Sequence, residues 1–195
     1  NKPSKKEALL NSAQDLMLEK GFVATSVDEI CCSSETTKGS FFHYFKSKEE
    51  LGKELVERFA QSVRGFMEEA LLSAGDDPLD RVYALIDVFI KSSEHPEFKG
   101  CLVGMFSQEL SKTHPEIMAI CTKSFEGATD IIKENLSQAK IKYAPKASFD
   151  ADSLAEHFIA ISQGSMIMMK AQQDRSIIKK NLMHFKQYLN YLFGK

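Results

Sequence analysis

The sequence predicts an all-α protein of about nine helices, and three kinds of observation support this fold class. Apolar residues recur at spacings of three and four along most of the chain, which is the period of an amphipathic helix. Several of these stretches begin with a capping-box pair, such as Ser4 with Glu7 and Ser26 with Glu29. Glycine and proline residues stand between the stretches and divide them into separate helices.

The first three predicted helices are short and follow one another closely. The first spans about Ser4 to Lys20, the second begins at Ser26, and the third begins at Thr36 or Thr37 and runs to Phe42. Two short helices joined by a turn of a few residues are typical of a DNA-reading helix-turn-helix. An ordinary helical hairpin with solvated polar residues has the same spacing and remains an alternative. The expected core of this module consists of Phe22, Val27, Ile30, Phe42 and Phe45.

The third helix has a surface suited to DNA. Thr37 and Lys38 stand at its N-terminus, where backbone N–H groups and the helix dipole favour a phosphate. Gly39 allows close approach of the DNA backbone, and Phe41 is expected to offer an apolar edge to a thymine methyl group. The predicted DNA-binding residues are Ser26, Thr37, Lys38, Gly39, Ser40, Phe41, His43, Tyr44 and Lys48.

Six longer or more apolar helices are expected after the turn at Ser47. A rod from Lys48 to about Leu72 would span roughly 37 Å at the helical rise of about 1.5 Å per residue. Asp77 and Pro78 provide a cap and a first position for the next helix. The remaining predicted helices are 78–93, 100–110, 115–138, 152–173 and 176–193, with a loop over 139–150.

The last two predicted helices suggest pairing with a second copy of the chain. Between Phe158 and Met169 the helix is apolar or small on every face, and such a helix must be covered on all sides. The last helix carries apolar residues at alternating spacings of four and three, which is typical of a packing seam. We therefore expect a homodimer built on a four-helix bundle. The predicted dimerisation residues are Phe158, Ile161, Ser165, Met169, Leu182, Phe185 and Leu189.

Two runs in the first quarter of the chain, Thr25–Ile30 and Thr37–Leu51, resemble the N-terminal domain of TetR-type transcriptional repressors, as does Leu9–Phe22. The resemblance implies a bacterial, dimeric, all-helical repressor that binds a pseudo-palindromic operator and is released by a small, largely apolar ligand. It also implies a helix-turn-helix domain over 1–47 and a larger helical ligand-binding and dimerisation domain over 48–195. Double-stranded operator DNA and a small-molecule effector are the partners that follow.

The chain has eight methionines, fourteen phenylalanines and no tryptophan, which favours a deformable interior. Core packing is a sufficient explanation for each of these residues alone, and a ligand chamber is expected for the set because the resemblance implies one. The predicted ligand-binding residues are Met67, Phe89, Cys101, Met105, Phe106, Phe125 and Met166. The run Lys99–Gly104 further resembles relatives that respond to electrophiles through a cysteine, which makes Cys101 a candidate thiol sensor.

The turn departs from the family pattern. Ser34–Thr37 reads Ser-Glu-Thr-Thr where the family usually has Ala-Gly-Val-Ser. Glycine accepts left-handed backbone angles that Glu35 accepts only with strain. Thr36 places a hydroxyl where a valine usually fills the core. We expect weakened operator affinity more than a changed fold.

Composition excludes several other classes. The formal net charge is −2, and residues 1–48 hold seven lysines against six acids, so the chain is not a general nucleic-acid coat. The four cysteines form no Cys-x-x-Cys pair, and the five histidines are scattered. We expect no catalytic site, metal or cofactor, no membrane span, and a reducing cytoplasm. Two alternatives stay open: a small-molecule-binding or thiol-sensing protein with weakened operator recognition, and a helical enzyme without a recognisable motif.

Overall fold

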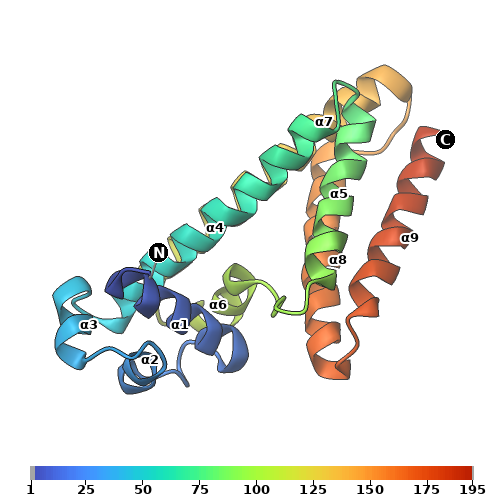
Figure 1. Ribbon diagram of the computed structural model, residues 1–195. Helices are drawn as coiled ribbons and strands as arrows, with labels where there is room; N and C mark the ends of the chain where they lie inside the picture. Colours follow the sequence, from blue (N-terminus) through green and yellow to red (C-terminus); the bar gives the residue numbers. More distant parts are fainter. Residues whose placement is uncertain (1–2, 195) are drawn as a thin grey trace. The chain divides into compact units, whose positions relative to one another are not determined.

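The computed structural model describes residues 3–194, and this part of the chain forms nine helices and no strand (Figure 1). The all-α fold class and the order of the predicted helices are confirmed. The helices are α1 (Lys5–Lys20), α2 (Val27–Ser33), α3 (Lys38–Tyr44), α4 (Lys48–Ser73), α5 (Pro78–Glu94), α6 (Leu102–Leu110), α7 (Pro115–Tyr143), α8 (Ala151–Gln172) and α9 (Ser176–Phe193).

The helix starts follow the predicted capping signals closely. Ser4 and Ser26 each accept a hydrogen bond from the backbone N–H of the residue three positions later, and the glutamate there accepts one in return. Thr37 caps α3 by accepting from Ser40 N at 3.1 Å. These side chains satisfy N–H groups that the first turn of each helix leaves without a partner.

One predicted boundary is wrong. Residues 139–143 were expected in a loop, but α7 continues to Tyr143. Ala139 is fully buried, so this last stretch of α7 still packs on one side. Pro145 then disfavours helical angles at the residue before it, and the helix ends.

Contacts divide the chain into two compact units. The first contains residues up to Ser62 together with the segment Cys101–Phe125, and the second contains Val63–Gly100 and the residues from Glu126 on. Helices α4 and α7 each contribute one part to either unit. The first unit, which we call the head, therefore holds α6 in addition to α1, α2 and α3.

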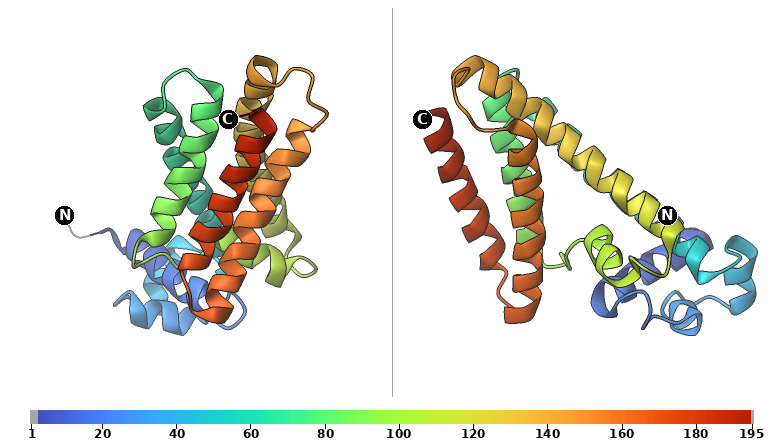
Figure 2. Two further views of the ribbon diagram at one scale, coloured as in Figure 1. Left: turned by 90° about the vertical axis from the view of Figure 1, so that its right-hand side faces the viewer. Right: turned by 180° about the vertical axis from the view of Figure 1, so that it is seen from behind.

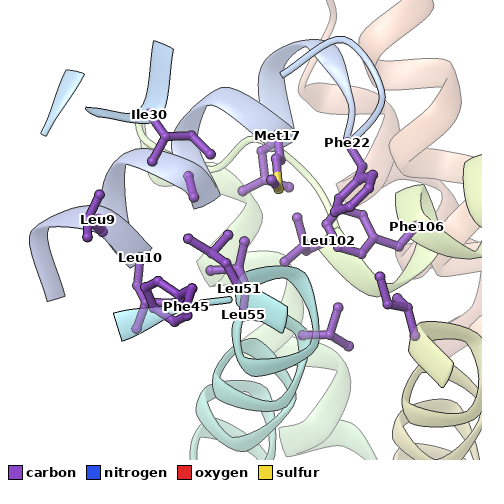
Figure 3. Packing of buried hydrophobic residues seen from close by; sticks show 14 of the residues in the cluster. Leu9, Leu10, Met17, Phe22, Ile30, Phe45, Leu51, Leu55, Leu102 and Phe106 are labelled. Carbon is purple, nitrogen blue, oxygen red and sulfur yellow. The ribbon is translucent and has the colours of Figure 1, made fainter. Parts of the chain in front are cut away.

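The head is built around a core of leucine and phenylalanine side chains (Figure 3). Phe22 and Phe45 are almost fully buried and Ile30 is fully buried, as predicted, and Val27 packs on the cluster with partial exposure. Leu102 and Phe106 of α6 belong to the same core. Full burial of such side chains stabilises a fold by about 1.5–3 kcal/mol each, so α6 is an integral part of the head.

The second unit is a layer of long helices in which α9 packs against both α5 and α8 (Figure 2). Two ion pairs join α9 to α5: Lys186 with Asp87 and Lys179 with Glu94, each at 2.8 Å. Asp77 caps α5 and also accepts hydrogen bonds from Lys142 and Tyr143 at the end of α7. The Lys142 hydrogen bond is the main reason why the pKa of Asp77 lies well below its usual range.

Within the described range, none of the helices combines the length and the apolar character that crossing a bilayer requires. Nor do His, Cys, Asp and Glu side chains gather there into a group of three or more that could hold a metal ion.

Candidate nucleic-acid interface

The start of α3 is polar and open to solvent. Thr37, Lys38 and Gly39 are exposed, and Ser40 is partly exposed. Only Thr37 Oγ1 lies within 4 Å of where a Cβ on Gly39 would be, at 3.7 Å. The first turn of α3 therefore offers a charged ammonium, hydroxyl groups and an unobstructed backbone, which are the groups that bind a phosphate oxygen.

Lys38 is held by an acid of the preceding helix. Its Nζ lies 2.8 Å from Asp28 Oδ1, and both side chains are largely exposed. This hydrogen bond raises the pKa of Lys38, so its ammonium stays protonated. An ammonium has three donors, so Lys38 can keep its bond to Asp28 while another N–H binds a DNA phosphate.

The prediction for Phe41 is wrong, and the error lies in the phase of the helix. Phe41 is fully buried and stacks on Phe45 with ring centroids 5.6 Å apart, so it cannot offer an edge to a base. Phe42, which was expected in the core, is 55% exposed. Phe45 is the C-cap residue of α3 and is buried in the same core as Phe41.

His43 and Tyr44 extend the exposed surface. His43 is exposed, and its ring meets that of Tyr44 edge-on with centroids 4.8 Å apart. Tyr44 is also exposed. Together with Phe42 these residues place an imidazole, a phenol and an apolar ring in succession, which gives α3 hydrogen-bonding and apolar groups for base edges.

Lys48 and Ser26 are engaged within the protein. Lys48 Nζ donates to the backbone oxygens of Phe22 and Thr25, each at 2.9 Å, and lies 4.5 Å from the centroid of the Phe22 ring. An ammonium has three donors, so one remains for a phosphate. Ser26 Oγ donates to Glu29 within the capping box. Both residues hold the loop before α2 in place.

The turn between α2 and α3 has the strained geometry that its sequence predicts. Glu35 has a positive φ of 52°, the left-handed conformation that favours glycine. The neighbouring Thr36 hydroxyl has a hydrogen-bond partner in Ser34 Oγ, 2.9 Å away. Ser34 Oγ itself donates to Ile30 O at 2.7 Å. Residues 34 and 36 thus form a half-buried hydrogen-bonded pair at the turn, where the family usually has alanine and valine.

The predicted ligand-binding residues are divided between the two units. Cys101, Met105 and Phe125 are partly exposed residues of the head, whereas Phe106 is fully buried in its core against Phe22. In the second unit Met166 is buried, while Met67 and Phe89 are partly exposed. Phe89 meets the rings of Phe98 and Phe158 edge-on.

An open groove of the second unit is lined by other residues. It runs along α4 and α7 and presents both signs of charge next to apolar side chains. The lining residues are Arg64, Leu71, Gly127, Asp130, Ile131, Glu134 and Asn135. No sequence pattern predicts this groove, because two helices far apart in the chain form it.

Most of the predicted dimerisation residues are buried within their own chain. Leu182 and Leu189 are fully buried, and Phe158, Ser165, Met169 and Phe185 are at most 6% exposed. The regular spacing that suggested a seam between chains is the inner face of α9 on α5 and α8. Ile161 alone of the set is partly exposed. Large apolar side chains do remain exposed on α8 and α9, whose solvent-exposed side we call their outer face: Ile167, Met168, Met183, Tyr188 and Tyr191.

Two family models match the chain. One, described as bacterial regulatory proteins of the tetR family, matches residues 9–55, and one described as the tetracyclin repressor-like C-terminal domain matches residues 78–185. Relatives include the HTH-type transcriptional repressor DhaR of Mycobacterium sp. strain GP1, 26% identical over 87% of this chain and 84% of the relative. Another is the HTH-type transcriptional repressor NemR of Escherichia coli K12, 24% identical over 94% of this chain and 93% of the relative. Among solved structures, the regulatory protein TetR from Rhodobacter sphaeroides is 25% identical, with a TM-score of 0.83 over 93% of this chain and 96% of that one.

Proposed function

From the premise that this chain belongs to the TetR family of bacterial transcriptional regulators, we propose that it is a repressor that reads operator DNA with α3. The observation that supports this is the combination of surfaces on that short helix. Lys38 and Gly39 are exposed at its start, His43 and Tyr44 are exposed towards its end, and Phe41 is buried beneath them. A recognition helix needs one face anchored in a core and the other free for the major groove.

The roles of the α3 residues follow from their chemistry. Lys38 and Thr37 bind phosphate and set the register of the head on the duplex. Phe42 takes the apolar role that the sequence had suggested for Phe41, and His43 and Tyr44 donate to base edges. Lys48 contributes its third donor from the start of α4.

Selection of bound duplexes from random DNA, followed by affinity measurement over a range of salt concentrations, tests this proposal. Lys38→Ala should weaken binding to all sequences and lower the slope of log K against log salt by about 1 for each head. His43→Ala should change the preferred sequence. Lys91→Ala removes the same charge from an exposed position of α5 and serves as the matched control. Equal binding by all four proteins would contradict the assignment of α3.

We also propose that the repressor acts as a homodimer on a pseudo-palindromic operator. The outer face of α8 and α9 supports this, because Tyr191 is 83% and Ile167 is 51% exposed although both are large and apolar. Large apolar side chains that remain exposed in this number are typical of a protein interface. A twofold axis through this face would give each half-site of the operator its own head.

A small, largely apolar effector is proposed to bind the second unit, near the partly exposed Met67 and Phe89. The edge-on rings of Phe98 and Phe158 beside Phe89 support this, since aromatic and methionine side chains form adaptable apolar sites. Thermal-shift measurements with apolar metabolites test it, and Phe89→Ala should abolish any shift that wild type shows.

Thiol sensing is a second candidate, and one contact of Cys101 favours it. Cys101 is the N-cap of α6, and its Sγ accepts a hydrogen bond from Gly104 N at 3.4 Å. Alkylation of this sulfur would remove the cap from a helix of the head. Iodoacetamide treatment of a Cys32→Ser protein, which lacks the exposed thiol of α2, should then lower operator affinity, and Cys101→Ser should prevent the loss.

A further inference from the structure

The loop between α1 and α2, residues 21–26, is held by a residue far away in the sequence. Both oxygens of the Glu109 carboxylate on α6 accept a backbone N–H from this loop. Phe22 N lies 2.7 Å from Oε2, and Val23 N lies 2.8 Å from Oε1. Hydrogen bonds to an ionised acceptor are stronger than neutral ones, and two parallel bonds also fix direction. α6 therefore holds the backbone of the loop, and not only its side chains.

The close approach depends on the residue before the two donors. Gly21 has a φ of +91°, and a Cβ at this position would lie 2.8 Å from Glu109 Oε2. Phe106, one turn earlier on α6, meets the ring of Phe22 edge-on with centroids 5.3 Å apart (Figure 3). Residues 106 and 109 share a face of the helix because they are three apart. One face of α6 thus provides both an apolar and a polar contact to the same loop.

Lys48 holds the same loop by binding the carbonyl groups of the loop. Its ammonium binds the backbone oxygens of Phe22 and Thr25, so the backbone of Phe22 donates to an acid and accepts from a base. Ser26, the next residue, caps α2. With both sides of the loop fixed, the direction in which α2 leaves it is fixed too.

α2 is one of the two helices that hold α3 in place, and the other is α1. α2 and α3 pack on each other and are connected by the tight turn over residues 34–37, in which Ser34 N and Thr36 N donate to carbonyl oxygens of α2. The pair Asp28 and Lys38 also links the start of α2 to the start of α3. A shift of the loop is therefore passed to the first turn of α3, which carries the proposed phosphate contacts.

We propose that Glu109 is a positioning residue for operator binding, and that α6 is a working part of the DNA-reading head. This rests on the proposed function, and it extends that function from residues 1–47 to a helix more than fifty residues further along the chain. Glu109 touches no DNA in this scheme. It acts through the Phe22 and Val23 amides on α2, and through α2 on α3.

The test uses the full-length chain with Glu109→Gln, which keeps the size of the side chain but leaves one oxygen to accept. Glu126→Gln makes the same charge change at an exposed site of α7 and is the matched control. Affinity is measured for the duplex that the wild-type protein selects. A separate titration at saturating DNA gives the fraction of protein that is able to bind, and the affinity is expressed per active protomer. We expect Glu109→Gln to bind about tenfold more weakly per active protomer. We also expect a smaller salt slope, because a misplaced α3 makes fewer phosphate contacts.

These readouts separate positioning from stabilisation. If Glu109 merely stabilised the fold, the active fraction would fall, and the affinity and salt slope of the remaining protein would equal those of wild type. That outcome overturns the inference. If wild type selects no duplex at all, the proposed function fails and this inference fails with it. If wild type binds and Glu109→Gln binds equally well, only the role of Glu109 is refuted.

Discussion

Replacing Glu35 by glycine should make the protein more stable and should tighten operator binding, for two separable reasons. The residue sits at φ +52° in the turn between α2 and α3. A left-handed conformation costs a residue with a β-carbon about 1–2 kcal/mol. Glycine removes this strain but has a more flexible unfolded chain, which offsets about 0.4–1 kcal/mol. The net gain in the free energy of unfolding should be about 0.5–1 kcal/mol.

Thermal and urea unfolding followed by circular dichroism at 222 nm measure this gain, which should appear as a rise in Tm of about 1–4 °C for a chain of this size. Glu35→Gln is the matched control, because it removes the charge and keeps the β-carbon. The glycine variant should be more stable than the glutamine variant, whereas both should bind operator DNA more tightly than wild type at low salt. Equal stability of the two variants would refute the argument from strain, and unchanged DNA affinity in both would refute the argument from charge.

The remaining predictions concern the capping box, the phase of α3 and the pairing of chains. A hydrogen bond from Lys20, followed by the capping-box bonds of Ser26, lowers the pKa of Glu29 to about 2. The folded state therefore binds fewer protons than the unfolded state. The stabilisation that ionised Glu29 provides is present above about pH 4.3 and is lost as pH falls towards about 2. Glu29→Gln should flatten that part of the stability curve, as acid titration followed by circular dichroism will show. Phe41→Ala should lower the free energy of unfolding by about 3–5 kcal/mol. Phe42→Ala should change it by no more than about 0.5 kcal/mol yet weaken operator binding. Urea unfolding and a DNA titration distinguish the two variants, and the reverse pattern would contradict the assignment of Phe41 as buried and Phe42 as exposed. In sedimentation experiments, Ile167→Glu should convert the proposed dimer to a folded monomer. A charge at the buried Leu189 should instead unfold the chain. If the wild-type protein sediments as a monomer, the proposed pairing is refuted.

Local signals in the sequence were enough for the helices and their starts. Ser26, Thr37 and Asp77 cap helices where the pattern placed them, because a capping side chain acts on N–H groups two or three residues away. The strain at Glu35 was also predictable, since the left-handed requirement belongs to the turn itself.

Contacts between distant segments could not be read in the same way. Nothing in the sequence links Glu109 to residues 22 and 23, and only folding brings it to the Phe22 and Val23 amides. The helical period likewise shows that an apolar face exists, but it does not say what covers the face. For Leu182 and Leu189 the cover is the same chain and not a partner.

The phase error at Phe41 has a different cause. Both Phe41 and Phe42 are large and apolar, so hydrophobicity alone does not distinguish an inward residue from an exposed one. The distinction appears only in the structure, where Phe41 packs against the ring of Phe45, the buried residue that ends α3. An exposed phenylalanine at position 42 then needs its own reason, and a base edge in the major groove supplies one.

The charges of the head explain why it should act in pairs. Asp28 binds Lys38, Glu29 binds Lys20, and backbone oxygens bind Lys48. A DNA phosphate therefore shares each of these ammonium groups with an acceptor that is already bound, and such a contact gains less than binding a lysine that is otherwise solvated. One head then binds weakly and discriminates mainly through its base contacts. Two heads on one duplex recover affinity because the first contact raises the effective concentration of the second. In the proposed dimer, the apolar side chains exposed on α8 and α9 therefore matter for operator affinity as well as α3.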